Sequence, residues 1–223
     1  MLLTEPIVTL VCTFSGFLFG LLYTFVVVSP WVYETQYSFS LSAQALSFLG
    51  LISGAALAPL PLALVDTLVY QPRLRRHVAQ HGESVQCPAE HRLYASLLGS
   101  ITLPCSLLGF ACTAHFRIHF MVPIVFQGLA MMSSTLIYAP VNLFMLDTYG
   151  PLYGASASGA AMLTRYLLSA AFPLFGLRMY KALGVGWATS LLAFVTVAMA
   201  PIPWLFWKFG VRLRERGKYE VSS

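Results

Sequence analysis

Six long apolar segments dominate the sequence and limit what it can fold into. They are residues 7–28, 46–65, 93–113, 120–146, 155–177 and 182–207. Each reaches the roughly 20 residues that an α-helix needs to cross the hydrocarbon core of a bilayer. Backbone N–H and C=O groups must all be paired inside lipid, and the segments lack the period-two alternation of barrel strands. We therefore expect an all-α membrane protein, a bundle of six transmembrane helices over residues 7–207.

The composition excludes a soluble enzyme and a disordered chain. Of the 223 residues, 58% are hydrophobic and only 9% are charged, whereas a soluble domain carries roughly 25% charged residues. The 16 Phe and 11 Tyr residues are too much apolar surface for a disordered chain. The first apolar segment is longer than the core of a signal peptide and follows an acidic flank, Thr4-Glu5-Pro6, so we expect it to remain as a span.

The distribution of Lys and Arg predicts the orientation in the membrane. One set of loops and the tail hold nine of them: Arg73, Arg75, Arg76, Arg92, Lys208, Arg212, Arg214, Arg216 and Lys218. The opposite loops hold three: Arg117, Arg178 and Lys181. Because loops rich in Lys and Arg stay in the cytosol, both the short amino-terminal segment 1–6 and the basic tail 208–223 are predicted to be cytosolic. This placement accounts for the net charge of +5 without a nucleic-acid partner; recognition of anionic lipid is a weaker alternative.

No group of residues predicts an enzyme, a metal site or a cofactor. Three of the four cysteines lie in apolar segments, and Cys87 lies in the basic loop, where we expect a reduced thiol. His115 and His119 flank Arg117 without a third ligand at a suitable spacing. Phosphate-binding glycine loops, nucleophile elbows and paired carboxylates are absent from the sequence. We therefore expect no catalytic residues, no metal and no cofactor.

Prolines and small residues recur within the apolar segments. The prolines are Pro59, Pro61, Pro104, Pro123, Pro140, Pro173, Pro201 and Pro203. Each removes a helical hydrogen bond, which indicates either the ordinary irregularity of membrane helices or a bundle that must move, as a transporter does. Small residues lie four apart at Gly16 and Gly20, Gly50 and Gly54, and Ser156 and Ala160. This spacing favours close helix packing inside one bundle over dimerisation.

Arg165 is the one full charge deep within a segment. A charge there costs at least about 2.5–3.5 kcal/mol, so its side chain should face protein or water. It is interpreted either as a contact to an anionic group or carboxylate, or as a structural tie that reaches helix-end carbonyls or the membrane surface. Asp66 and Asp147 lie at the predicted cytosolic ends of spans. No acidic residue falls clearly at the midplane, although a proton-coupled carrier usually needs a titratable group on its pathway.

A series of short motifs resembles one transporter family in order along the chain. The motifs are Thr4-Glu5-Pro6-Ile7-Val8, Gly20-Leu21-Leu22-Tyr23, Pro88-Ala89-Glu90-His91-Arg92-Leu93, Leu146-Asp147-Thr148-Tyr149, Ala155-Ser156-Ala157, Arg165, Phe172-Pro173-Leu174-Phe175, Met179-Tyr180, Leu183-Gly184, Pro201-Ile202-Pro203 and Gly210-Val211-Arg212-Leu213-Arg214. Together they resemble the carboxy-terminal six-helix half of fungal major facilitator transporters of the drug:proton antiporter type, including the multidrug and polyamine branches. Cys112 departs from the family where a tryptophan is frequent, and Gly128-Leu129-Ala130 departs where a second glycine is frequent.

The resemblance implies proton-coupled efflux of small organic molecules or drugs by a complete carrier, which would bind its substrate near the midplane between two halves. It implies substrate contacts at Tyr23, Gln127, Asn142 and Arg165, and gating or proton-carrying roles for Asp147 and Asp66. The partners would be the lipid bilayer, the organic substrate, and a second copy or a separate amino-terminal half. The family implies the plasma membrane, and a vacuolar membrane would give the same charge bias. The alternative is a truncated, non-transporting membrane protein or a modulatory subunit of a full-length carrier.

Overall fold

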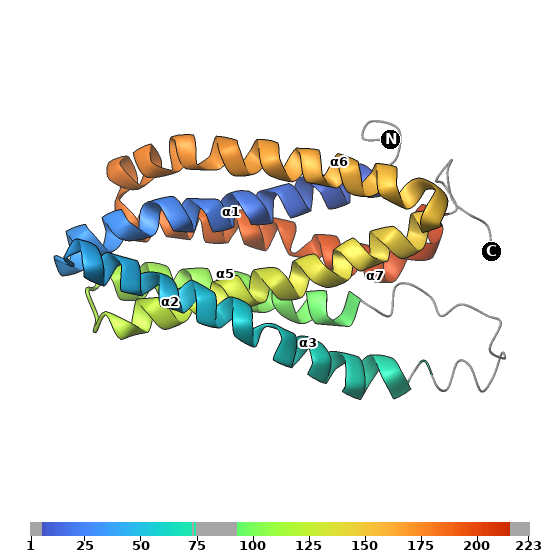
Figure 1. The fold of residues 1–223 in the computed structure, drawn as a ribbon, viewed down its shortest axis with the longest axis horizontal. Helices are drawn as coiled ribbons and strands as arrows, with labels where there is room; N and C mark the ends of the chain where they lie inside the picture. Colours follow the sequence, from blue (N-terminus) through green and yellow to red (C-terminus); the bar gives the residue numbers. More distant parts are fainter. Residues whose placement is uncertain (1–5, 73, 75–92, 215–223) are drawn as a thin grey trace.

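The computed structural model describes residues 6–72, 74 and 93–214, and this part of the chain is helical without β-strands (Figure 1). The helices are α1 (Pro6–Tyr37), α2 (Leu41–Leu57), α3 (Pro59–Val65), the π-helical turn η1 (Asp66–Tyr70), α5 (Tyr94–His115), α6 (Met121–Met199) and α7 (Pro201–Arg214). The basic-loop predictions for Arg73, Arg75, Arg76, Cys87 and Arg92, and those for Arg216 and Lys218 in the tail, lie outside the described residues.

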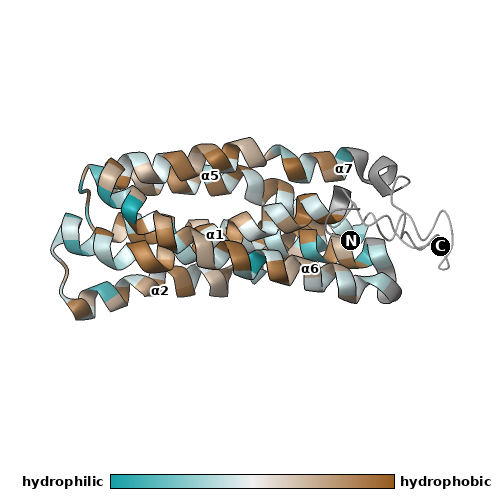
Figure 2. Ribbon diagram, turned by 90° about the horizontal axis from the view of Figure 1, so that it is seen from above, coloured by the Kyte–Doolittle hydropathy of each residue, from teal (hydrophilic) through white to brown (hydrophobic). Residues whose placement is uncertain are grey.

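Five segments of the described chain are long and apolar enough to cross a membrane. They are Val8–Tyr37, Leu41–Tyr70, Tyr94–His115, Met121–Asp147 and Tyr153–Lys208. Hydrophobic residues lie along outward-facing as well as inward-facing turns of the helices (Figure 2), as expected for a surface solvated by lipid. The prediction of an all-α membrane protein is confirmed. The last segment, at 56 residues, is much longer than one crossing requires.

The helical segment α6 reverses its direction along the bundle twice. The Arg165 guanidinium donates a hydrogen bond to the Tyr138 hydroxyl, 27 residues earlier; a straight helix would separate them by about 40 Å. The second reversal lies at Gly184, whose φ of 78° is one that glycine adopts readily. Across it, the Tyr180 and Thr189 hydroxyls are 2.9 Å apart. In Figure 1 the yellow, orange and red parts of the α6 region accordingly run back and forth along the bundle.

Prolines end two of the helices. Helix α2 ends at Leu57 and α3 begins at Pro59, while α6 ends at Met199 and α7 begins at Pro201. Proline fits the first turn of a helix because its missing N–H is not needed there. The predicted interruptions at these two places are confirmed. Pro104 remains inside α5, and α1 continues through Pro30 to Tyr37, beyond the apolar segment 7–28.

Helix α1 lies at the centre of the bundle and α2 at its edge. Most of the α1 span is buried, whereas little of the Leu41–Tyr70 span is. Val11, Leu18, Leu21 and Phe25 of α1 belong to the main hydrophobic core, which also includes residues of α5 and α6. Helix α1 therefore provides the surface against which residues of α6 pack.

Glycines allow α2 to touch α6 backbone to backbone. A Cβ atom on Gly54 would lie 2.1 Å from the carbonyl oxygen of Gly128, and one on Gly50 would lie 2.6 Å from that of Ile124. On α1, a Cβ atom on Gly20 would lie 2.7 Å from the ring of Phe172. The prediction that these glycines serve close packing inside one bundle is confirmed for the pairs in α1 and α2.

The connections lie at two opposite ends of the bundle (Figure 1). The α1–α2 turn, the α5–α6 turn and the orange-to-red reversal of α6 lie at one end; the start of α1, the end of α3, the start of α5 and α7 lie at the other. At the first end, the Arg117 side chain donates a hydrogen bond of 3.0 Å to Gln36. Successive connections thus alternate between the two ends of the bundle, which agrees with the predicted order of loops. The start of α1 and α7 lie at the same end.

Candidate functional site

Arg165 is buried against two aromatic rings that contact each other. Its side chain is 8% exposed, and it donates a hydrogen bond to the Tyr138 hydroxyl. Its Cζ atom lies 5.0 Å from the centre of the Phe19 ring and 4.9 Å from the centre of the Tyr138 ring. The two rings meet edge to face, with centroids 5.1 Å apart. Cation–π contacts of this kind are worth about 2 kcal/mol or more when desolvated, so the rings make the buried charge tolerable.

Arg165 forms no ion pair with a carboxylate among the described residues. Its hydrogen bond is with the Tyr138 hydroxyl, and its cation–π contacts are with the rings of Phe19 and Tyr138. A guanidinium has five N–H donors, and it binds carboxylate, phosphate and carbonyl groups in a planar, two-pronged geometry. The group formed by Phe19, Tyr138 and Arg165, called here the Arg165 centre, thus combines a guanidinium with an aromatic surface, a chemistry suited to acidic or carbonyl-bearing groups.

Two further predicted residues lie one helical turn from this centre. Tyr23 follows Phe19 by four residues on α1, and Asn142 follows Tyr138 by four residues on α6, a spacing that puts side chains on the same helix face. Tyr23 is 48% exposed, and Asn142 is half-buried. By this spacing, Tyr23 and Asn142 each lie one helical turn from the aromatic pair that contacts Arg165.

Gln127 occupies a different, fully buried position. The Tyr33 hydroxyl donates to its Oε1 at 3.0 Å, and its Nε2 donates to the Ser29 hydroxyl at 2.8 Å. Gln127 precedes Tyr138 by eleven residues on the same helix, about 17 Å along its axis. Both ends of the amide are therefore used to tie α6 to α1, away from the Arg165 centre.

Removing this tie should weaken the bundle without touching the Arg165 centre. Gln127→Leu leaves the Tyr33 and Ser29 hydroxyls without their partner in a dry interior. We expect a loss of about 1 kcal/mol in unfolding free energy, because buried hydrogen bonds in membrane proteins average ~0.6 kcal/mol and reach ~1.7 kcal/mol. Denaturant titration of the purified chain measures this. Tyr33→Phe is the matched control, since it removes one of the two hydrogen bonds and should cost less; an equal or larger loss would contradict the assignment.

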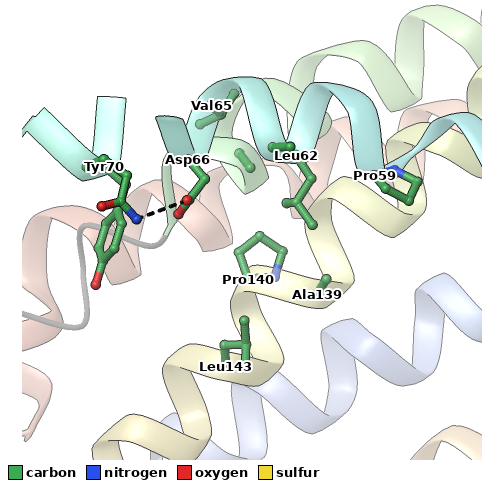
Figure 3. A pocket seen from close by; sticks show the side chains of 11 residues that line it. Pro59, Leu62, Val65, Asp66, Tyr70, Ala139, Pro140 and Leu143 are labelled. Atoms are coloured by element: carbon green, nitrogen blue, oxygen red, sulfur yellow. Dashed lines mark hydrogen bonds between the residues drawn. The ribbon is translucent and has the colours of Figure 1, made fainter. Parts of the chain in front are cut away.

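The two candidate acids lie away from the Arg165 centre. Asp147 is exposed and follows Tyr138 by nine residues, about 14 Å along the helix. Asp66 is exposed at the start of η1, and its Oδ2 accepts a hydrogen bond of 3.3 Å from Gln71. Asp66 also lines a cavity between α3, α5 and α6 (Figure 3). The structure does not bring either carboxylate to Arg165.

Sequence reasoning missed the partners of Arg165. Tyrosine and phenylalanine are common in the sequence, so nothing marks Tyr138 or Phe19 as a partner of Arg165. Phe19, Tyr138 and Arg165 lie on three separate stretches of the chain. They come together only because of how the helices pack against one another. The spacing of residues within a single helix does not predict that packing.

Comparison with known proteins finds membrane transporters over the whole length of the chain. It is 36% identical to the MFS transporter prlG of Fungal sp. (strain NRRL 50135) across 100% of the chain and 45% of that protein. It is 34% identical to the efflux pump atB of Aspergillus terreus across 98% of the chain and 46% of that protein. It is 32% identical to the probable drug/proton antiporter YHK8 of Saccharomyces cerevisiae across 98% of the chain and 41% of that protein. The chain thus spans less than half the length of each of these relatives. No protein-family model and no solved structure matches it.

Proposed function

The chain belongs to the major facilitator superfamily, and from this premise we propose that it acts as the carboxy-terminal half of an efflux carrier. The whole carrier would export small organic molecules in exchange for protons. The observation that carries the proposal is the match of essentially the whole chain to transporters and efflux pumps over somewhat less than half of their length. In such carriers, substrate sites lie near the bilayer midplane between two halves that rock against each other.

Six crossings complete such a half. Four are supplied by the spans from Val8 to Asp147, and the segment Tyr153–Lys208 supplies two, divided by the turn at Gly184. An even number of crossings puts the start of α1 and the tail on the same side. With the Lys and Arg distribution of the sequence, that side is the cytosol, and the plasma membrane is the expected location.

The Arg165 centre is the proposed substrate contact of this half. Phe19 and Tyr138 offer aromatic surface, Arg165 offers donors for an acidic or carbonyl group, and Tyr23 and Asn142 extend the contact by one turn in either direction. We place Gln127 in the support of the site, because its amide is already satisfied by Tyr33 and Ser29. Asp147 and Asp66 are the candidates for a gating or proton-carrying role at the cytosolic end.

Transport should require a second half. We expect a yeast strain that produces both this chain and the amino-terminal half of the efflux pump atB to export a fluorescent dye, and export to stop when a protonophore collapses the proton gradient. Co-purification of the two halves is the check that they assemble before export is measured. Strains with either half alone are the controls.

The same strains distinguish the alternative function. A modulatory subunit would be favoured by two results together. The chain would co-purify with a full-length relative, and the pair of halves would export no more dye than the strains with either half alone. Export by the chain alone would point to assembly of two copies, which cross-linking of the purified chain detects.

A further inference from the structure

A cavity of about 230 Å³ lies between the end of α5 and the part of α6 that follows the reversal at Gly184. One wall includes Cys112 and His115 of α5, and the facing wall includes Trp187 and Ser190 of α6. No residue of the Arg165 centre lines this cavity. The α5–α6 turn lies at the same end of the bundle (Figure 1), the end whose loops are predicted to face away from the cytosol.

Two metal-binding side chains share one wall of the cavity. Cys112 and His115 are three residues apart on α5, a spacing that puts both side chains on one helix face with their Cβ atoms about 5–6 Å apart. Both residues are exposed, and the Cys112 thiol is free. The imidazole packs against Gly186, where a Cβ atom would lie 3.1 Å from the Nδ1 atom of His115. The missing side chain of Gly186 therefore leaves room for the imidazole in the cavity.

The two side chains select a particular class of ion. Thiolate ligands select soft metals such as Cu(I), and imidazole also suits copper. Among the described residues, no three His, Cys, Asp or Glu side chains form a group that could hold a metal, so a zinc site with three or four protein ligands does not fit. Cu(I) and Ag(I) are held by two ligands in a line, so they do not need the third ligand that the sequence lacks. The ring of Trp187 on the facing wall adds a face that attracts cations.

We propose that Cys112 and His115 bind one soft monovalent metal ion, Cu(I) or Ag(I), in the cavity beside Trp187. Binding releases a proton: the S–H bond of Cys112 breaks, a metal–sulfur bond forms, and the proton passes to the solvent. The imidazole contributes the lone pair of a ring nitrogen, and the oxidation state of the metal does not change. Binding needs neither a second half nor transport, so the inference stands or falls separately from the proposed function.

The test measures binding of Cu(I) to the purified full chain in the absence of oxygen, in competition with a coloured Cu(I) chelator. We expect wild type to retain one ion in a tight site. Cys112→Ser should abolish this tight binding. His115→Gln keeps every thiol and should weaken the binding at least about tenfold, because even the loss of an outer-shell partner costs a metal site 10- to 100-fold. Cys105→Ser and His119→Gln are the matched controls: each removes an exposed ligand that does not line the cavity, and both should bind like wild type.

X-ray absorption tests the same site without any substitution. With one equivalent of Cu(I) bound, the ion should have one sulfur and one nitrogen neighbour. Unfolding midpoints of the variants show whether they remain folded. Equal affinity of wild type and His115→Gln would overturn the proposal, and so would two sulfur neighbours and no nitrogen. A loss with Cys105→Ser as large as that with Cys112→Ser would overturn it as well.

Discussion

Gly54→Ala is expected to destabilise the bundle, although the same change stabilises most helices. The added Cβ would lie 2.1 Å from the Gly128 carbonyl oxygen and 2.7 Å from its carbonyl carbon. These are backbone atoms that cannot rotate away, so α2 and α6 must separate, and the neighbouring contact of Gly50 with Ile124 separates with them. Overpacking costs about 1–3 kcal/mol, against a gain in helix propensity of roughly 0.8–1 kcal/mol. We therefore expect a net loss of up to about 2 kcal/mol for alanine and failure to assemble for Gly54→Leu.

Gly159→Ala is the matched control for this prediction. Gly159 lies inside α6, and a Cβ atom there would meet nothing within 4 Å. The same substitution should therefore stabilise the chain by up to about 1 kcal/mol, through helix propensity alone. Denaturant titration in one detergent compares the two variants directly. Shifts of the same sign and size would show that α2 and α6 do not pack as closely as described.

The contact between α2 and α6 shows how far the sequence predicts this fold. The spacing of Gly50 and Gly54 predicts a surface for close helix packing, and that surface exists. The sequence does not name its partner, Gly128, because one glycine among small residues on another segment carries no pairing signal. Similarly, the apolar segments predict membrane-spanning helices, but the reversals of α6 depend on contacts such as that of Arg165 with Tyr138.

For the candidate site too, the sequence predicts some features and leaves others open. The cost of a charge in the membrane selects Arg165 from the sequence, and it also predicts a protein environment for the side chain. That environment turns out to be aromatic rather than a carboxylate or helix-end carbonyls. The family resemblance implies a substrate contact for Gln127, yet in the structure its amide is satisfied by Tyr33 and Ser29. Hydrogen-bond demand identifies polar residues at depth, whereas their partners decide whether they support the structure or face a ligand.

Arg165→Gln is expected to reduce export by the two-half carrier strongly while the chain still inserts and folds. Glutamine keeps a polar side chain but loses the charge and the donors that face a substrate acceptor. Hydrogen bonds to charged groups contribute about 1.5–3 kcal/mol, and each 1.4 kcal/mol corresponds to about tenfold in binding, so we expect a loss of roughly 10- to 100-fold in export. Dye efflux at equal amounts of inserted protein measures it.

Two companion variants separate a role in binding from a structural role. Arg165→Lys keeps the charge but loses the planar contact with Phe19 and Tyr138, so partial export is expected. Tyr138→Phe removes the hydrogen bond to the guanidinium and keeps the ring, so export should fall only slightly. If Arg165→Gln instead exports like wild type, Arg165 does not contact the substrate. A side chain needed only for binding leaves folding unchanged when it is replaced. If Arg165→Gln fails to insert or unfolds while Tyr138→Phe inserts and folds like wild type, the charge of Arg165 is therefore needed for the packing of α1 and α6.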